Sequence, residues 1–147
     1  MHRRPKRDWH PAGEAILRRV ALLHFLLRHH LQRECAMKYL CLVYLDEKKL
    51  DTVPDSECIA CGEELRQSGH SIAAEALQGV DTATTVRVRN GKMAVTDGPF
   101  AETKEQLAGF YLIDAKDLNE AIQLASKIPP ARVGSVEVRP VRELSAP

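Results

Sequence analysis

The stretch VTDGPFAETKEQL, residues 95–107, places an acid, a glycine and a proline in succession between a strand-like segment and a helix-like one. Asp97 is the residue here whose type best suits chemistry. A carboxyl group that is fully buried can have its pKa raised by roughly 3–5 units, and it can then act as a general acid or base near neutral pH. The alternative is a turn residue whose oxygen accepts hydrogen bonds from the backbone N–H groups of residues 98–100. Both roles stay open for Asp97.

Four further polar residues are candidates for binding a substrate, namely Glu75, Glu102, Lys104 and Arg139. Glu102 and Lys104 border a predicted helix start, where a solvated acid stabilises the helix dipole, so a structural role competes with ligand binding. Glu75 lies among alanines on a predicted strand, which leaves space for a pocket. The guanidinium of Arg139 suits a carboxylate ligand, but a cross-strand or intersubunit ion pair is the competing explanation.

Cys58 and Cys61 have a C-x-x-C spacing, which occurs in redox and zinc sites. Redox cysteines stand at a helix N-terminus, whereas the helix predicted here begins several residues earlier. A structural zinc site needs four ligands, and no second pair has a suitable spacing. We therefore expect both cysteines to pack in the core. We also expect no metal and no cofactor, because the chain contains no phosphate-binding loop, dinucleotide fingerprint, nucleophile elbow or metalloprotease motif.

Residues 84–97, TTVRVRNGKMAVTD, predict a β-hairpin with a type I′ turn at Asn90-Gly91. The two-residue loop fixes the cross-strand pairs as Thr84 with Asp97, Val86 with Val95, Val88 with Met93 and Arg89 with Lys92. Because side chains alternate along a strand, the four apolar members share one face. Asp97 falls on that same face, and we expect its carboxylate to point toward the buried side of the protein.

The other face of this hairpin is basic and carries Arg87, Arg89 and Lys92. A nucleic-acid surface needs a larger basic patch with stacking aromatic residues. We therefore expect a solvated edge and no nucleic-acid partner.

The remaining elements follow from hydrophobic periodicity and capping signals. Strands are predicted at 38–45, 71–78, 109–115 and 133–141. Helices are predicted from an N-cap at Thr52 to a C′ glycine at Gly69, over the short T-x-x-Q segment at 103–106, and from Asp117 to Pro129-Pro130. With the hairpin treated as an insertion, the order from Met37 is two β-α-β units, which indicates an α+β fold of the ferredoxin-like type.

Two helices on one face of such a sheet leave its other face bare. The strands at 38–45 and 109–115 are nevertheless apolar on both faces. The second face must therefore be covered, and a second copy of the same sheet is the simplest cover. We expect a homodimer with its sheets face to face and a pocket for a small-molecule ligand between them.

Composition separates residues 1–36 from the rest of the chain. The first 36 residues carry eight Lys/Arg and three Asp/Glu, whereas residues 37–147 carry thirteen and seventeen. Three explanations of the basic segment stay open: an upstream start codon, an amphipathic surface helix, or a targeting segment. It is too short and too charged to span a bilayer, and it lacks the cleavage site of a signal peptide. We expect it to lie outside the fold of the 37–147 domain.

The cysteines show no secreted disulfide pattern, so we expect a cytoplasmic protein without a membrane partner.

The segments MKYLCLVYLDE, ATTVRVRNGKMAVTDGPFAETKEQLAGFYLIDAKDLNEAI and GSVEVRPV resemble the YCII-related proteins, specifically their DGPF-domain branch, over residues 37–147. The resemblance implies a ferredoxin-like dimeric α+β barrel. It also implies cytoplasmic bacterial proteins, some encoded beside genes of extracytoplasmic-function sigma factors. Members of the wider family use a His–Asp pair in a cleft, and one branch catalyses a dehydrochlorination.

The sequence departs from the family pattern at two places. The position of the helix histidine falls near Cys58, and His70 is the only histidine after residue 36, so the His–Asp pair does not carry over. The segment IAAEAL, residues 72–77, replaces a glycine-rich turn that precedes Glu75, and alanine does not adopt left-handed conformations as cheaply as glycine does.

Two functions are consistent with these residues. The first is a cofactor-free enzyme of isomerase or lyase type, with Asp97 as acid and base toward a small organic molecule in an intersubunit cleft. The second is a non-catalytic ligand-binding or regulatory module, linked to an extracytoplasmic-function sigma factor, that uses the same cleft.

Overall fold

A computed structural model describes residues 37–144 of the chain. The chain divides into two units, Met1–Cys35 and Ala36–Pro147. The expectation about the basic segment at 1–36 lies outside the described residues.

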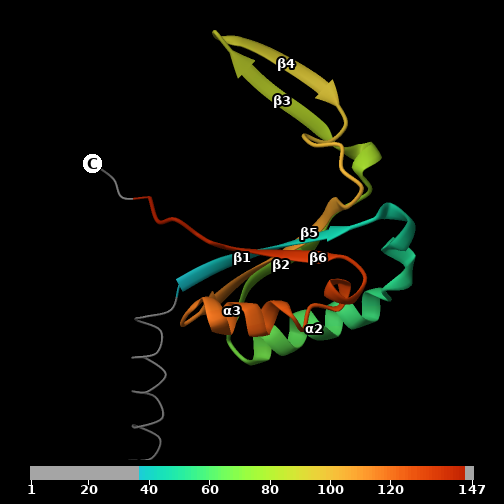
Figure 1. Cartoon of the computed structure of the whole chain (residues 1–147). Helices are drawn as coiled ribbons and strands as arrows, with labels where there is room; N and C mark the ends of the chain where they lie inside the picture. Colours follow the sequence, from blue (N-terminus) through green and yellow to red (C-terminus); the bar gives the residue numbers. More distant parts are fainter. Residues whose placement is uncertain (1–36, 145–147) are drawn as a thin grey trace, which may run out of the picture. The chain divides into compact units, whose positions relative to one another are not determined.

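Four antiparallel strands form the main sheet. They are β1 (Met37–Leu45), β2 (Ser71–Ala76), β5 (Gln106–Ala115) and β6 (Ser135–Pro140), in the order β2-β5-β1-β6. Two helices, α2 (Asp55–Gln67) and α3 (Leu118–Ala125), lie on the same face of this sheet (Figure 1). This arrangement is consistent with the α+β fold of ferredoxin-like type that the element order predicts, with β1 and β5 in the centre.

The first helix begins later than the sequence predicts. Residues Glu47–Thr52 form a 3-10 helix, η1, which Asp46 caps by accepting a hydrogen bond from the Lys48 N–H at 3.1 Å. The Thr52 hydroxyl donates to the Lys49 carbonyl oxygen and ends this turn. The N-cap of α2 is therefore Pro54, and the assignment of that role to Thr52 is wrong.

The end of α2 is as predicted. Gly69 has a φ of +78°, its N–H donates to the Arg66 carbonyl, and the His70 N–H donates to the Leu65 carbonyl. This is the Schellman arrangement, in which a left-handed residue, usually glycine, satisfies the last free carbonyls of a helix.

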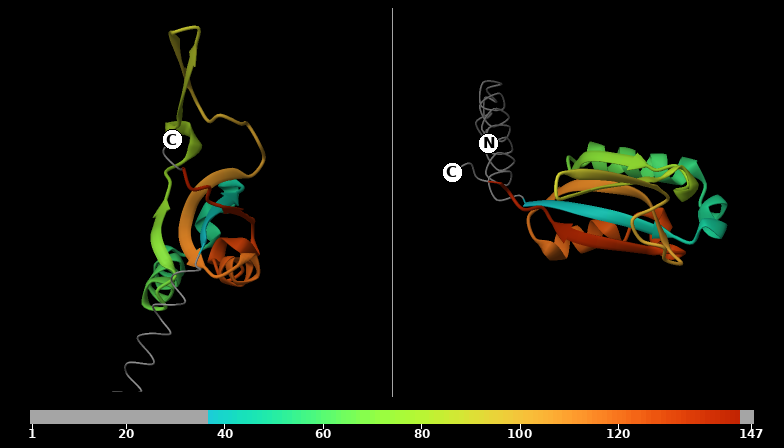
Figure 2. Two further views of the ribbon diagram at one scale, coloured as in Figure 1. Left: turned by 90° about the vertical axis from the view of Figure 1, so that its left-hand side faces the viewer. Right: turned by 90° about the horizontal axis from the view of Figure 1, so that it is seen from above.

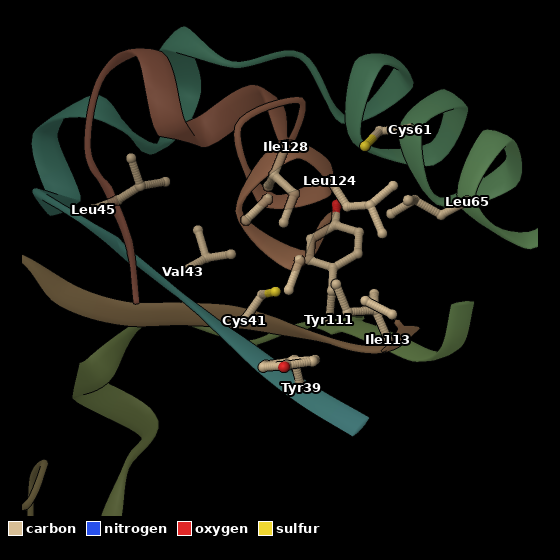
Figure 3. Packing of buried hydrophobic residues seen from close by; sticks show 13 residues of the cluster. Tyr39, Cys41, Val43, Leu45, Cys61, Leu65, Tyr111, Ile113, Leu124 and Ile128 are labelled. Carbon is tan, nitrogen blue, oxygen red and sulfur yellow. The ribbon is translucent and has the colours of Figure 1, made fainter. Parts of the chain in front are cut away.

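The hydrophobic core lies between the helices and the sheet (Figure 3). On β1 every second residue faces it, so that Tyr39, Cys41, Val43 and Leu45 are buried. The prediction that the cysteines of α2 pack in the core is confirmed for Cys61, which is buried, whereas Cys58 is only half-buried.

The opposite face of the sheet, which we call the open face, is covered by neither α2 nor α3 (Figure 2). Its centre consists of half-buried apolar side chains from β1 and β5, because these alternate with the core residues and pair across the two strands. They are Leu40, Leu42, Tyr44, Leu107, Phe110 and Leu112.

The inserted hairpin consists of β3 (Thr84–Arg89) and β4 (Lys92–Asp97), which form a separate two-stranded sheet. All the predicted cross-strand pairs are present. Asn90 and Gly91 have φ values of 51° and 72°, as a type I′ turn requires.

Asp97 shares a face with the apolar residues as predicted, but that face is exposed to solvent. The expectation that Asp97 points toward a buried side is therefore wrong for a single chain, because no core lies behind the hairpin.

The short helix predicted at 103–106 is not formed. The Thr103 hydroxyl donates to the Glu105 carbonyl, and the Gln106 side-chain amide donates to the Thr103 carbonyl. Local side-chain hydrogen bonds of this kind compete with helix formation. Gln106 then pairs with Leu45 and opens strand β5.

Candidate functional site

A cavity of about 450 Å³ lies at the root of the hairpin, where the connections to β2 and β5 meet the end of the open face. Its volume falls within the range of small-molecule sites. Tyr44 and Leu107 belong to the open face, and Pro99 and Phe100 belong to residues 97–100, which we call the DGPF segment. The other lining residues are Leu77, Gln78, Gly79, Val80, Thr82, Ala83, Ala101, Thr103 and Gln106. We call this space the root cavity.

The root cavity has mostly apolar walls, with the polar groups of Gln78, Thr82, Thr103, Gln106 and Tyr44 among them. Its lining contains no charged residue. Thr82 donates to the Gly79 carbonyl at 2.8 Å and thereby holds its own turn in place. Such a lining suits a small organic molecule that is largely apolar and has one or two polar groups.

Asp97, Glu102 and Lys104 lie in the segment that surrounds the root cavity, but none of the three lines it. All three side chains are exposed. The structure therefore brings these residues to one part of the molecule without gathering them around a common point.

The turn after Asp97 is held by other groups. The Gly98 N–H donates to the Ala83 carbonyl at 2.8 Å, and the Thr85 hydroxyl donates to the Gly98 carbonyl at 2.9 Å. Gly98 has a φ of +101°, a conformation that favours glycine. The backbone and Thr85, rather than the Asp97 carboxylate, thus satisfy the polar groups of this turn.

Glu75 and Arg139 lie on opposite edge strands of the main sheet. Glu75 pairs with Phe110 and Arg139 pairs with Leu40, so both side chains are on the open face. Arg139 Nε lies 3.4 Å from Glu137 Oε1, an ion pair within the strand between two exposed side chains. Such pairs contribute little to stability, and Arg139 remains accessible to a ligand or a second chain.

A second cavity, about 400 Å³ in volume, lies between α2, η1 and the edge strand β2. Apolar side chains dominate its lining, and the residues with polar or ionisable groups are Asp51, Asp55, Cys58, Glu75 and Tyr111. Alternation along β2 places Glu75 on the open face, opposite to Ala74 and Tyr111.

Cys58 and Tyr111 of this second cavity are poorly suited to act at neutral pH. Burial raises the pKa of the Cys58 thiol, and the nearby Asp55 and Glu57 raise it further. Burial also raises the pKa of Tyr111 to about 12. Cys58 stands near the place of the family's helix histidine, but a thiol held in its protonated form is a weak nucleophile and a weak base.

Sequence reasoning did not identify Tyr44, Phe100 and Gln106 as lining residues of the root cavity. Phe100 belongs to the DGPF segment. The signal that could have identified it is an apolar aromatic residue directly after a glycine-proline turn, and the structure shows that its side chain is strongly exposed. The other two were assigned to the sheet or to a helix. Only the tertiary structure brings the end of β1 beside the hairpin connections.

Within residues 37–144, no group of three or more His, Cys, Asp or Glu side chains is arranged to hold a metal ion. Among the helices described, none is both long and apolar enough to cross a membrane.

Comparisons with known proteins identify the family. The family model of the YCII-related domain matches residues 37–145. An uncharacterised protein of Rhizobium meliloti (strain 1021) is 54% identical over 61 residues, which are 40% of this chain and 49% of that protein. The matched segment thus spans about half the length of that relative. Because the family model covers most of the chain, including both cavities and the whole four-stranded sheet, the chain belongs to the family of YCII-related proteins.

Proposed function

We propose that this protein is a cofactor-free enzyme that transfers protons on a small organic molecule, in a cleft that two copies of the chain form together. The observation that carries the proposal is the root cavity, which adjoins the DGPF segment and the open face of the sheet. Its apolar lining can hold the carbon skeleton of a substrate. Asp97 is two residues from the cavity wall at Pro99 and supplies the acid and base.

The homodimer supplies what a single chain lacks. The open face has a half-buried apolar centre, and two packed sheets lie roughly 10 Å apart with their side chains interdigitated. A second copy on this face covers the open side of the root cavity. Glu75 and Arg139 then lie at the margins of the interface, where Arg139 can bind an anionic group of a substrate.

A partner surface also changes the environment of Asp97. The carboxylate is exposed in one chain, and a neighbouring apolar surface excludes bulk water from it, so that it exchanges protons with a bound substrate rather than with solvent. A single carboxylate can remove a proton from carbon and return it at a neighbouring position. It can also remove the proton while a leaving group departs. Isomerisation and elimination therefore fit this site better than hydrolysis by a nucleophile.

A second function is a non-catalytic ligand-binding or regulatory module that uses the same cavity. The observation that favours it is the uncharged lining of the root cavity, in which polar contacts come from hydroxyl and amide groups. Such groups orient a ligand without taking part in proton transfer.

The experiment that separates the two functions follows carbon-bound protons directly. Wild-type protein is incubated in D₂O with a panel of small carbonyl compounds, and proton–deuterium exchange is followed by NMR. We expect exchange with wild type, loss of exchange by about 100-fold or more in Asp97→Asn, and retained exchange in the control variant Glu64→Gln, which changes an exposed carboxylate on α2. Binding without exchange in the wild type supports the ligand-binding module. Exchange that survives in Asp97→Asn contradicts the role of Asp97.

A further inference from the structure

The apolar face of the β3–β4 hairpin is uncovered. Its four side chains, Val86, Val88, Met93 and Val95, are 58%, 59%, 71% and 55% exposed. They form two adjacent cross-strand pairs, Val86 with Val95 and Val88 with Met93, and thus one continuous strip. An isolated two-stranded hairpin is marginally stable in water and gains stability when an apolar face packs against something else. This strip is therefore suited to contact another surface.

The position of the hairpin selects that surface. The hairpin stands on the side of the main sheet opposite to α2 and α3, which is the side of the open face (Figures 1 and 2). Each of its strands has six residues, a length of about 20 Å. Two sheets packed face to face are separated by only about 10 Å. The hairpin is thus long enough to pass a second sheet on the open face and to reach along its edge.

We propose that the β3–β4 hairpin is a clasp that packs its apolar strip against a second copy of this chain. The proposal rests on the homodimer of the proposed function and adds the hairpin to its interface. In a two-fold symmetric dimer each chain supplies one open face and one hairpin. The same symmetry operation therefore covers the open face and the apolar strip of both chains.

The clasp also explains the arrangement around Asp97. Asp97 lies on the same face of the hairpin as the apolar strip, at the end nearest the root cavity. When the strip contacts the partner, the partner's surface lies beside Asp97 and excludes water from it. The site is therefore incomplete in one chain, and the second copy supplies its missing wall.

The basic face of the hairpin stays free for solvent. Arg87, Arg89 and Lys92 point away from the strip because they occupy the alternate positions of the two strands. The guanidinium of Arg87 lies 5.8 Å from the centre of the Phe100 ring, a contact that ties this face to the wall of the root cavity. The apolar strip can therefore contact the partner without disturbing the contact between Arg87 and Phe100.

The test uses the full chain and three variants. Met93→Asp places a charge on the apolar strip, Thr96→Asp places the same charge on the opposite face of the same strand, and Leu42→Asp places it on the open face. Light scattering over a range of protein concentrations gives the dissociation constant of the dimer, and circular dichroism checks the fold.

We expect Met93→Asp to raise the dissociation constant by about tenfold or more, because each chain loses one apolar side chain that the dimer buries. We expect Thr96→Asp to change it by less than about twofold, because a solvated position contributes little.

A second measurement follows the hairpin in the unmodified protein. Peroxide oxidises exposed methionine to the sulfoxide, which mass spectrometry quantifies for each residue. We expect Met93 to be protected at concentrations where the dimer forms and to react quickly on dilution. Met37, which is 49% exposed and lies on the helix-facing side of β1, serves as the internal reference.

The outcomes separate the clasp from the dimer itself. A wild-type chain that stays monomeric at all concentrations overturns both the clasp and the intersubunit cleft. A wild-type dimer that Leu42→Asp dissociates, but in which Met93→Asp and Met93 oxidation have no effect, overturns the clasp alone. A dimer that Leu42→Asp leaves intact, while Met93→Asp dissociates it, supports the clasp and contradicts the face-to-face packing.

Discussion

Single residues in the core of this domain show how burial alone sets chemical behaviour. The Cys41 thiol lies on the helix-facing side of β1 and is fully buried. Burial raises its pKa from 9.0 to about 11. Tyr111 is 8% exposed and has its pKa raised from 10.0 to about 12, again chiefly by burial. Both groups therefore favour their neutral forms in the folded state.

These shifts predict how stability depends on pH. Because the folded pKa of Cys41 is raised, its contribution is fully present below pH 9.0 and is lost as the pH rises to about 11. The loss from this one residue amounts to about 3 kcal/mol. Tyr111 adds a further loss between pH 10.0 and about 12. Urea unfolding across this pH range measures the decline. In Cys41→Val the first part of the decline should be absent, and an unchanged pH dependence in that variant would contradict the assignment.

Asp117 illustrates a residue whose role follows from local hydrogen bonds. It is the N-cap of α3, where its Oδ1 accepts from the Glu120 N–H at 2.8 Å. Glu120 in turn accepts from the Lys116 N–H at 2.8 Å, so two free donors at the helix start are satisfied.

We predict that Asp117→Ala lowers the free energy of unfolding by about 1 kcal/mol, because the Glu120 N–H loses its acceptor. Asp117→Asn should keep most of the stability, since asparagine is an equally good N-cap. Denaturant unfolding at neutral pH measures both. Equal losses in the two variants would show that the charge of Asp117, rather than its capping geometry, matters.

At the scale of elements, close backbone contacts decide how β2 sits against the sheet. A Cβ atom on Gly109 of β5 would lie 2.8 Å from the Glu75 carbonyl oxygen and 3.3 Å from the Ala76 Cα atom. Backbone atoms cannot move aside as a flexible side chain can, so glycine at this position permits the pairing of β5 with the edge strand.

Gly109→Ala should therefore push β2 away from β5 and destabilise the domain by about 1–3 kcal/mol, as overpacking does elsewhere. Gly62→Ala is the matched control. Gly62 lies in α2 with no atom within 4 Å of an added Cβ, and alanine there should stabilise the helix by up to about 1 kcal/mol. Thermal unfolding of both variants measures the contrast. A Gly109→Ala protein as stable as wild type would mean that β2 shifts without cost.

At the scale of the whole molecule, the four-stranded sheet separates two different surfaces. Its helix-facing side carries the core, and its other side carries the apolar centre, Glu75 and Arg139. The hairpin is an insertion between β2 and β5. The domain can therefore fold around the sheet, and the insertion is free for the proposed contact with a second copy.

We predict that a chain beginning at Met37 folds with the same unfolding midpoint as the full chain, within about 2 °C, because the core cluster lies entirely within residues 39–128. Calorimetry of the two chains side by side measures this. A shorter chain that is insoluble or melts much earlier would show that residues 1–36 cover part of the domain, and the open face would be the first place to look for that contact.

Much of this architecture is readable from the sequence, because it depends on short-range rules. The Asn90-Gly91 turn fixes the hairpin register, Gly69 ends α2, and Asp117 starts α3, each through local backbone geometry. The run at 38–45 shows a strand that is apolar on both faces, and the element order gives the sheet. The rules fail where two local signals compete. Thr103 and Gln106 fit a capping box, but the pairing of Gln106 with Leu45 across the sheet makes the segment a turn and a strand.

By itself, the sequence determined most of the strands and helices, the family resemblance and the face on which each strand residue lies, since periodicity and turn chemistry are local properties. Only the tertiary structure decided that Asp97 is exposed, that Tyr44 meets the DGPF segment in the root cavity, and that the apolar strip of the hairpin has no cover within residues 37–144. The physical reason is that burial depends on what lies opposite a residue in space. That neighbour comes from a distant part of the chain, and alternation along a strand says only which way a side chain points.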